Sequence, residues 1–188
     1  MAAEFLDLGF EHSYDVEINP EFPPAGAWGI PDFRFGKRGR ETLTIKVRPQ
    51  HGGSWVASFA IENRGVINGV YACPDPQQLA VVTGWDAFLM QASDPTDSNE
   101  LPIHPIRAVV RPAETGLLVV GSYTDAAAID TAGLRWVTYR LFLDDLEFVE
   151  GPPGNISVQG RNGYFADDLV VLTLDPAAGR VIARSPKP

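Results

Sequence analysis

The chain has 188 residues, of which 45% are hydrophobic and 21% charged, and its formal net charge is −9. These values exclude a disordered chain, because enough apolar surface is present to bury a core without disulfides or metals. The acidic balance argues against nucleic-acid binding, since neutralising phosphates requires a basic face. At this length we expect a single domain spanning residues 1–188.

Residues 1–41 are predicted to form an irregular arm, because closely spaced prolines and glycines prevent a continuous helix. The short basic stretch 37–40 is expected to be a solvated turn. Four aromatic side chains in the arm would be costly to expose together, so we expect the arm to lie across a sheet and cover its core. The alternative is a partner-binding patch formed by the same four residues: Phe22, Trp28, Phe33 and Phe35.

Apolar and polar residues alternate from Thr42 onward, where Leu43, Ile45 and Val47 are separated by polar residues, as is typical of a strand with one wet face. Short turns rich in glycine and proline separate further stretches of this kind. One short helix, 125–130, is predicted before Gly133. The predicted strands are 42–48, 55–61, 66–71, 79–82, 87–90, 106–111, 117–120, 134–141, 146–149, 156–159 and 169–174.

Many short strands and no recurring long helix predict an all-β, mainly antiparallel fold, arranged as a sandwich or a distorted barrel. Propeller-like blades are the alternative. It rests on the strand 169–174, which runs into Asp175-Pro176-Ala177-Ala178-Gly179, a turn that also occurs at the outer edge of propeller blades. The stretch 80–95, which ends Ser93-Asp94-Pro95, is a fainter second copy.

No catalytic, cofactor-binding or metal-binding residue is predicted. His12, His51 and His104 are widely separated, and none has a cysteine or second histidine at ligand spacing. The sequence His51-Gly52-Gly53 resembles an esterase oxyanion loop, but no Gly-x-Ser-x-Gly accompanies it, so we expect an ordinary hairpin turn.

The only cysteine, Cys73, excludes an intramolecular disulfide and is expected to be a buried or semi-buried structural thiol. The acidic pairs Asp144-Asp145 and Asp167-Asp168 are expected in turns or as solvated surface residues, because neighbours on a strand point to opposite faces and would not converge on a substrate. No signal peptide and no apolar run long enough to span a membrane is visible, so a cytoplasmic location and no membrane partner are expected.

The segment 133–146 reads Gly-Leu-Arg-Trp-Val-Thr-Tyr-Arg-Leu-Phe-Leu-Asp-Asp-Leu. It resembles a stretch in small bacterial β-rich proteins of unassigned function, in which a Gly-Leu-x-Trp strand leads through Arg-Leu into an Asp-x-Leu turn. The resemblance covers roughly the last 80 residues and implies a related fold without implying an activity. If the strand continued to residue 143, Trp136, Arg140 and Asp144 would share one face, with Arg140 supporting the turn.

Missing catalytic motifs and the acidic charge predict a non-catalytic protein-interaction module, of the acidic inhibitor or immunity type, with a basic protein partner. No cofactor is expected, and the partner-binding residues and oligomeric state stay open. The alternative is an enzyme or a small-ligand-binding β domain whose site is assembled from distant strands. A concave polar site would favour this alternative, whereas an exposed aromatic patch would favour the interaction module.

Overall fold

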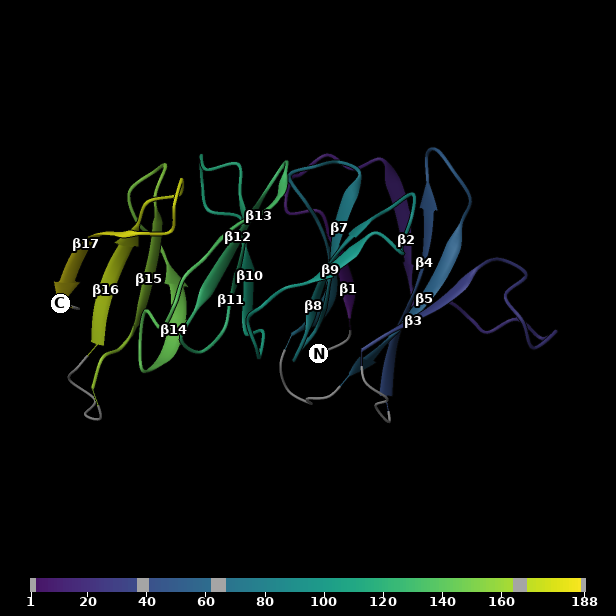
Figure 1. The fold of residues 1–188 in the computed structure, drawn as a ribbon, viewed down its shortest axis with the longest axis horizontal. Coiled ribbons are helices and arrows are strands. Elements are labelled where there is room, and N and C mark those ends of the chain that lie inside the picture. The colour runs from purple at the N-terminus through teal and green to yellow at the C-terminus, as the bar shows by residue number, and fades with distance from the viewer. Residues whose placement is uncertain (1–2, 37–40, 62–66, 164–168, 187–188) are drawn as a thin grey trace. The chain divides into compact units, whose positions relative to one another are not determined.

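The structure is a computed structural model that describes residues 3–36, 41–61, 67–163 and 169–186. All regular structure in these residues is β-strand (Figure 1). The predicted all-β, mainly antiparallel fold is therefore confirmed, and no helix that could cross a membrane occurs in the described part of the chain. The chain divides into two compact units, residues 1–100 and 101–188. The prediction of a single domain stays a prediction.

The N-terminal unit contains two sheets. Sheet A has the strand order β1-β6-β7-β8-β9, and sheet B has the order β2-β4-β5-β3. Both are antiparallel except for the parallel pairs β1–β6 and β3–β5. The strands of sheet A are β1 (Glu4–Leu6), β6 (Asn68–Ala72), β7 (Gln78–Thr83), β8 (Ala87–Gln91) and β9 (Ser98–Glu100). Those of sheet B are β2 (Tyr14–Ile18), β3 (Asp32–Phe35), β4 (Glu41–Pro49) and β5 (Trp55–Ile61).

The C-terminal unit also contains two sheets, both fully antiparallel. In each of them the strand order follows the chain order. The strands of sheet C are β10 (Ala108–Val110), β11 (Leu118–Gly121), β12 (Ala126–Asp130) and β13 (Gly133–Val137). Those of sheet D are β14 (Asp144–Val149), β15 (Ile156–Arg161), β16 (Leu169–Leu174) and β17 (Val181–Pro186).

Each unit has its own hydrophobic core between its two sheets. In β4 the predicted alternation is confirmed, since Leu43, Ile45 and Val47 are fully buried while Thr44 and Lys46 are half-buried. These three residues pack with side chains of sheet A, among them Leu79 and Val81 of β7. Sheets C and D meet in the same way, through Val119, Ala128 and Trp136 on one side and Leu146, Val158 and Leu172 on the other. In β4, burial of one face therefore fixes the register, because a slip by one residue would bring the apolar side chains to the other face.

Meanders make up sheets C and D and most of sheet A, and no sheet is closed within the described residues. In none of the four sheets do the two edge strands pair with each other within the described residues, so none closes into a barrel. Sheets C and D and the strands β6–β9 of sheet A are each formed by one continuous stretch of chain. Each unit is thus a sandwich-like pair of sheets. Sheets C and D, and the strands β6–β9 of sheet A, also have the strand order of a propeller-like blade.

Turns recur at equivalent places in these meanders. Between the second and third strands, the Thr83 N–H donates to the Asp86 carbonyl at 2.9 Å in sheet A, and the Ser122 N–H donates to the Asp125 carbonyl at 2.8 Å in sheet C. Between the third and fourth strands, the carboxylates of Asp130 and Asp175 each accept a backbone N–H from two residues ahead. In both sheets a register shift follows in the fourth strand. These shared features support a common structural repeat in the chain.

Two predictions about the C-terminal unit are wrong. The predicted helix 125–130 is strand β12, because Ala126, Ala127 and Ala128 are fully buried and lie between β11 and β13. The predicted strand 134–141 ends at Val137. After it, the Thr138 hydroxyl bonds the Ala126 backbone and Arg140 has a φ of +50°, which a strand does not allow.

The segment expected as an arm contributes three short strands, β1, β2 and β3. Its aromatic residues divide into two pairs. Phe33 and Phe35 pack against the core of the N-terminal unit, as expected for residues that cover a sheet. Phe22 is 58% exposed and contacts the half-buried Trp28 edge to face, with ring centroids 5.3 Å apart. The basic stretch 37–40 lies outside the described residues.

Candidate functional site

The structure separates the three residues that the sequence placed on one face. Trp136 is 8% exposed, and its indole N–H donates to the Pro176 carbonyl at 2.9 Å. Arg140 is exposed, and its backbone N–H donates to the Asp125 carboxylate. Asp144 accepts a hydrogen bond from the Asp145 N–H, while Asp145 forms the ion pair of this region, with Arg161 at 2.8 Å. The predicted arrangement of Arg140 between Trp136 and Asp144 is therefore wrong.

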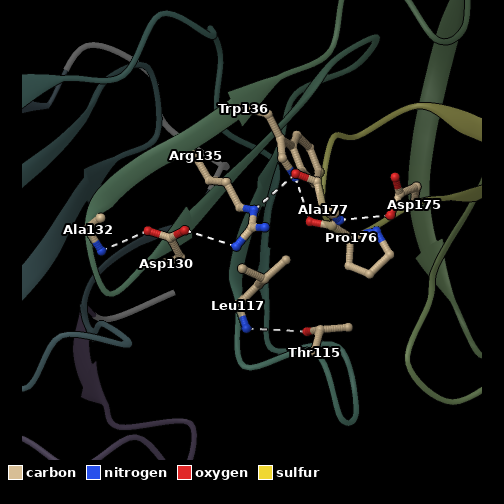
Figure 2. A network of polar contacts seen from close by, with 9 residues as sticks. All are labelled: Thr115, Leu117, Asp130, Ala132, Arg135, Trp136, Asp175, Pro176 and Ala177. Atoms are coloured by element: carbon tan, nitrogen blue, oxygen red, sulfur yellow. Dashed lines mark hydrogen bonds and ion pairs between the residues drawn. The ribbon is translucent and has the colours of Figure 1, made fainter.

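Trp136 instead belongs to a contact that joins sheet C to sheet D (Figure 2). The neighbouring Arg135 donates to the Ala177 carbonyl at 3.0 Å and pairs with Asp130 at 3.0 Å. The indole also lies against Gly179, where an added Cβ would meet ring atoms at 2.7 to 3.2 Å. The turn after Asp175 thus packs against the Trp136 indole and accepts its hydrogen bond, and the role of this tryptophan is structural.

A similar contact joins the two sheets of the N-terminal unit. The indole N–H of Trp55, at the start of β5, donates to the Ala92 carbonyl at 2.7 Å, just after β8 ends. Trp55 is 2% exposed. In both units a tryptophan of one sheet therefore bonds the backbone at the turn between the third and fourth meander strands of the other sheet, which fixes how the two sheets pack.

The titratable residues singled out in the sequence differ in their surroundings. His12 packs against the rings of Phe5 and Tyr14, at 5.1 and 5.4 Å between centroids. His51 is exposed in the hairpin turn between β4 and β5, and His104 is exposed. The Cys73 thiol is fully buried, and burial, followed by the charge of Asp75, raises its pKa far above its ordinary value. The pair Asp167-Asp168 lies outside the described residues.

The segment between β2 and β3, residues 19–31, forms what we call the strap. It connects the two opposite edge strands of sheet B. At one end Asn19 exchanges hydrogen bonds with Thr44, the backbone one at 2.7 Å and the side-chain one at 3.0 Å. At the other end the Pro31 carbonyl accepts from the Val56 N–H at 2.9 Å. The strap is therefore tied to the two central strands of the sheet.

The strap borders a cavity of about 570 Å³, which we call the strap cavity. Phe22, Trp28 and Ile30 line it from the strap, and Asp32 and Arg34 line it from β3. Since Phe33 packs into the core and side chains alternate along a strand, Asp32 and Arg34 point to the outer face of sheet B. The strap cavity therefore opens on the face of sheet B that does not pack against sheet A.

The acidic charge is unevenly distributed along the chain. Residues 1–100 carry seven Lys and Arg against 14 Asp and Glu, a net charge of −7, whereas residues 101–188 carry eight against ten, a net charge of −2. In the strap and its flanking strands, Asp15, Glu21 and Asp32 are exposed. The exposed aromatic pair thus lies on the more acidic unit.

A second concave site lies in the C-terminal unit. This C-terminal cleft has a volume of about 410 Å³ and lies between the β10–β11 turn and the β14–β15 turn. Arg111 and Glu150 are its charged lining residues, and prolines and aliphatic residues form most of the rest. The sequence did not predict this cleft, because nothing in Arg111-Pro112 or Pro152-Pro153 indicates that the two turns lie close together.

Phe22 and Trp28 belong to the partner-binding patch that the sequence offered as an alternative, whereas the sequence did not predict the C-terminal cleft. Comparison with known proteins adds no further assignment: no protein-family model matches the chain, and no curated protein is similar to it. The resemblance of 133–146 to small bacterial β-rich proteins therefore stays a prediction.

Proposed function

We propose that this chain is a non-catalytic protein-interaction module of the acidic inhibitor or immunity type, and that it binds a basic protein partner through the strap. The observation that carries the proposal is the aromatic pair of Phe22 and Trp28, which stands partly exposed on the unit with a net charge of −7. Aromatic side chains are enriched at binding hot spots, and an acidic surface steers a basic partner toward them. The single, buried Cys73 supports a cytoplasmic location.

The test begins with the tagged full-length protein, which is used to capture partners at low salt for identification by mass spectrometry. Affinity is then measured with the purified partner. Phe22→Ala should weaken binding by about 30-fold, the loss typical of a hot-spot aromatic, without changing the melting temperature. Ile182→Ala is the matched control, because Ile182 is 59% exposed in the other unit. Equal binding by wild type and Phe22→Ala would contradict the proposal.

The C-terminal cleft supports a second candidate, a small-ligand-binding domain. It is favoured by one observation, a concave site in which Arg111 and Glu150 stand among apolar residues. Under this candidate a small molecule that raises the melting temperature of the wild type should fail to do so for Glu150→Gln. If Glu150→Gln still binds the basic protein partner, ligand binding in the cleft and partner binding at the strap are separate functions.

A further inference from the structure

The walls of the strap cavity have the chemistry that attracts a cation. The ring planes of Phe22 and Trp28 are inclined at 86° to each other, and both residues line the cavity. Aromatic faces attract cations through their quadrupole, and tryptophan does so most strongly. The strap therefore supplies an apolar lining that favours positive charge over a neutral or negative group.

The floor of the cavity adds a carboxylate. Asp32 and Arg34 stand two residues apart on β3 and therefore lie on the same outer face of sheet B. Asp32 is exposed, as expected for a group that is available to a partner. The positive charge of Arg34 opposes a cation, so Asp32 and the aromatic pair are the lining groups that favour one.

We propose that the strap cavity binds an arginine side chain of the basic partner, with the guanidinium stacked on the aromatic pair and hydrogen-bonded to Asp32. The inference rests on the proposed function and specifies what the strap recognises. Arginine fits better than lysine, because its planar guanidinium both stacks on a ring and donates two parallel hydrogen bonds to a carboxylate. The cavity volume of about 570 Å³ is ample for one such side chain.

The experiment follows the indole N–H signal of Trp28 in the ¹⁵N-labelled full chain by NMR, assigned by its loss in Trp28→Phe. The probe is a blocked Gly-Arg-Gly peptide. The control is the same peptide with citrulline, which has nearly the shape of arginine without its charge. The arginine peptide should shift the Trp28 signal saturably and bind at least about fivefold more tightly than the citrulline peptide. Equal affinity of the two peptides, or no shift of the signal, would overturn the inference.

Two variants decide the sign of the bound charge. Asp32→Asn should weaken the arginine peptide several-fold, whereas Arg34→Ala should strengthen it, because one removes an attractive charge and the other a repulsive one. The reverse pattern would mean that the cavity binds an anion, and it would overturn the inference. Unchanged melting temperatures of both variants show that the fold is intact.

The two proposals fail in different ways. If Phe22→Ala abolishes partner binding but the arginine peptide leaves Trp28 unchanged, the strap is still the interaction surface and only the arginine assignment is wrong. If the arginine peptide binds but the partner is indifferent to Phe22→Ala, the cavity recognises a cation and the proposed function is wrong.

Discussion

At the scale of single residues, Gly179 has two reasons to be glycine. Its φ is +66°, and an added Cβ would lie 2.7 Å from the nearest ring atom of Trp136. Gly179→Ala should therefore lower the free energy of unfolding by at least about 2 kcal/mol, from backbone strain and overpacking together. Gly154→Ala is the matched control, because Gly154 has a φ of +74° and open space around it. Equal destabilisation of both variants in urea titrations would show that the indole contact contributes nothing.

Cys73 gives the fold a defined pH dependence. Burial raises the pKa of the Cys73 thiol above its ordinary value of 9.0, so the folded protein keeps a proton that the unfolded chain loses at high pH. This contribution to stability is complete below the ordinary pKa and is lost as the pH rises from there toward the raised pKa. Burial, and then the charges of Cys73 and Asp75, also raises the pKa of Tyr14.

We therefore expect the free energy of unfolding to fall between pH 8.5 and pH 10.5, by up to about 1.4 kcal/mol per pH unit for each group. Urea titrations across this range measure it. Cys73→Ala should show a smaller slope than the wild type, and Tyr14 should account for part of what remains. A stability that is constant to pH 10.5 would show that the thiol is accessible to solvent.

At the scale of strands and turns, the indole contact predicts how sheets C and D depend on one hydrogen bond. Trp136→Phe keeps most of the ring and removes the donor to the Pro176 carbonyl, so the C-terminal unit should lose about 1 to 2 kcal/mol. Thermal unfolding measures the loss. Tyr139→Phe is the control, since Tyr139 is 92% exposed and its hydroxyl should matter little. Equal melting temperatures of Trp136→Phe and the wild type would contradict this account.

Most strands were predictable from the sequence, both those with one solvent-exposed face and the apolar runs of β7, β8 and β11, which are buried almost throughout. β4 shows the first case, because its polar residues report which side meets water. β12 was not predicted, because a run of alanines has high helix propensity and no period, and only burial between two strands makes it extended. Just after β13, the Thr138 hydroxyl bonds the backbone of residue 126, a tertiary contact that no local pattern shows.

The candidate site was predictable only in part, because some of its features depend on tertiary contacts. Clustered aromatics in a proline-rich segment flagged Phe22 and Trp28, while their separation from Phe33 and Phe35 depends on the direction in which β3 faces. Asp32 gave no signal of its own, because its place in the lining of the strap cavity follows from the course of the strap. The C-terminal cleft gave none either, because it joins two turns that are nearly forty residues apart.

At the scale of the whole molecule, the concentration of negative charge in residues 1–100 predicts salt-dependent association. The association rate constant with the basic partner should fall as salt rises, because charges are screened over about 8 to 10 Å at physiological ionic strength. Stopped-flow or surface-based kinetics measure this rate. Dissociation should depend on salt much less, since the aromatic contacts are short-range. An association rate constant that does not change with salt would contradict electrostatic steering and would mean that apolar contacts alone account for recognition.

Hydrogen–deuterium exchange of the full chain, free and saturated with its partner, tests most directly whether the strap is the interaction surface. We predict that protection on binding is concentrated in residues 19–32, with little change in the turns at 111–113 and 150–157 that border the C-terminal cleft. Protection confined to those two turns, with the strap exchanging as in the free protein, would contradict the account and place recognition in the cleft.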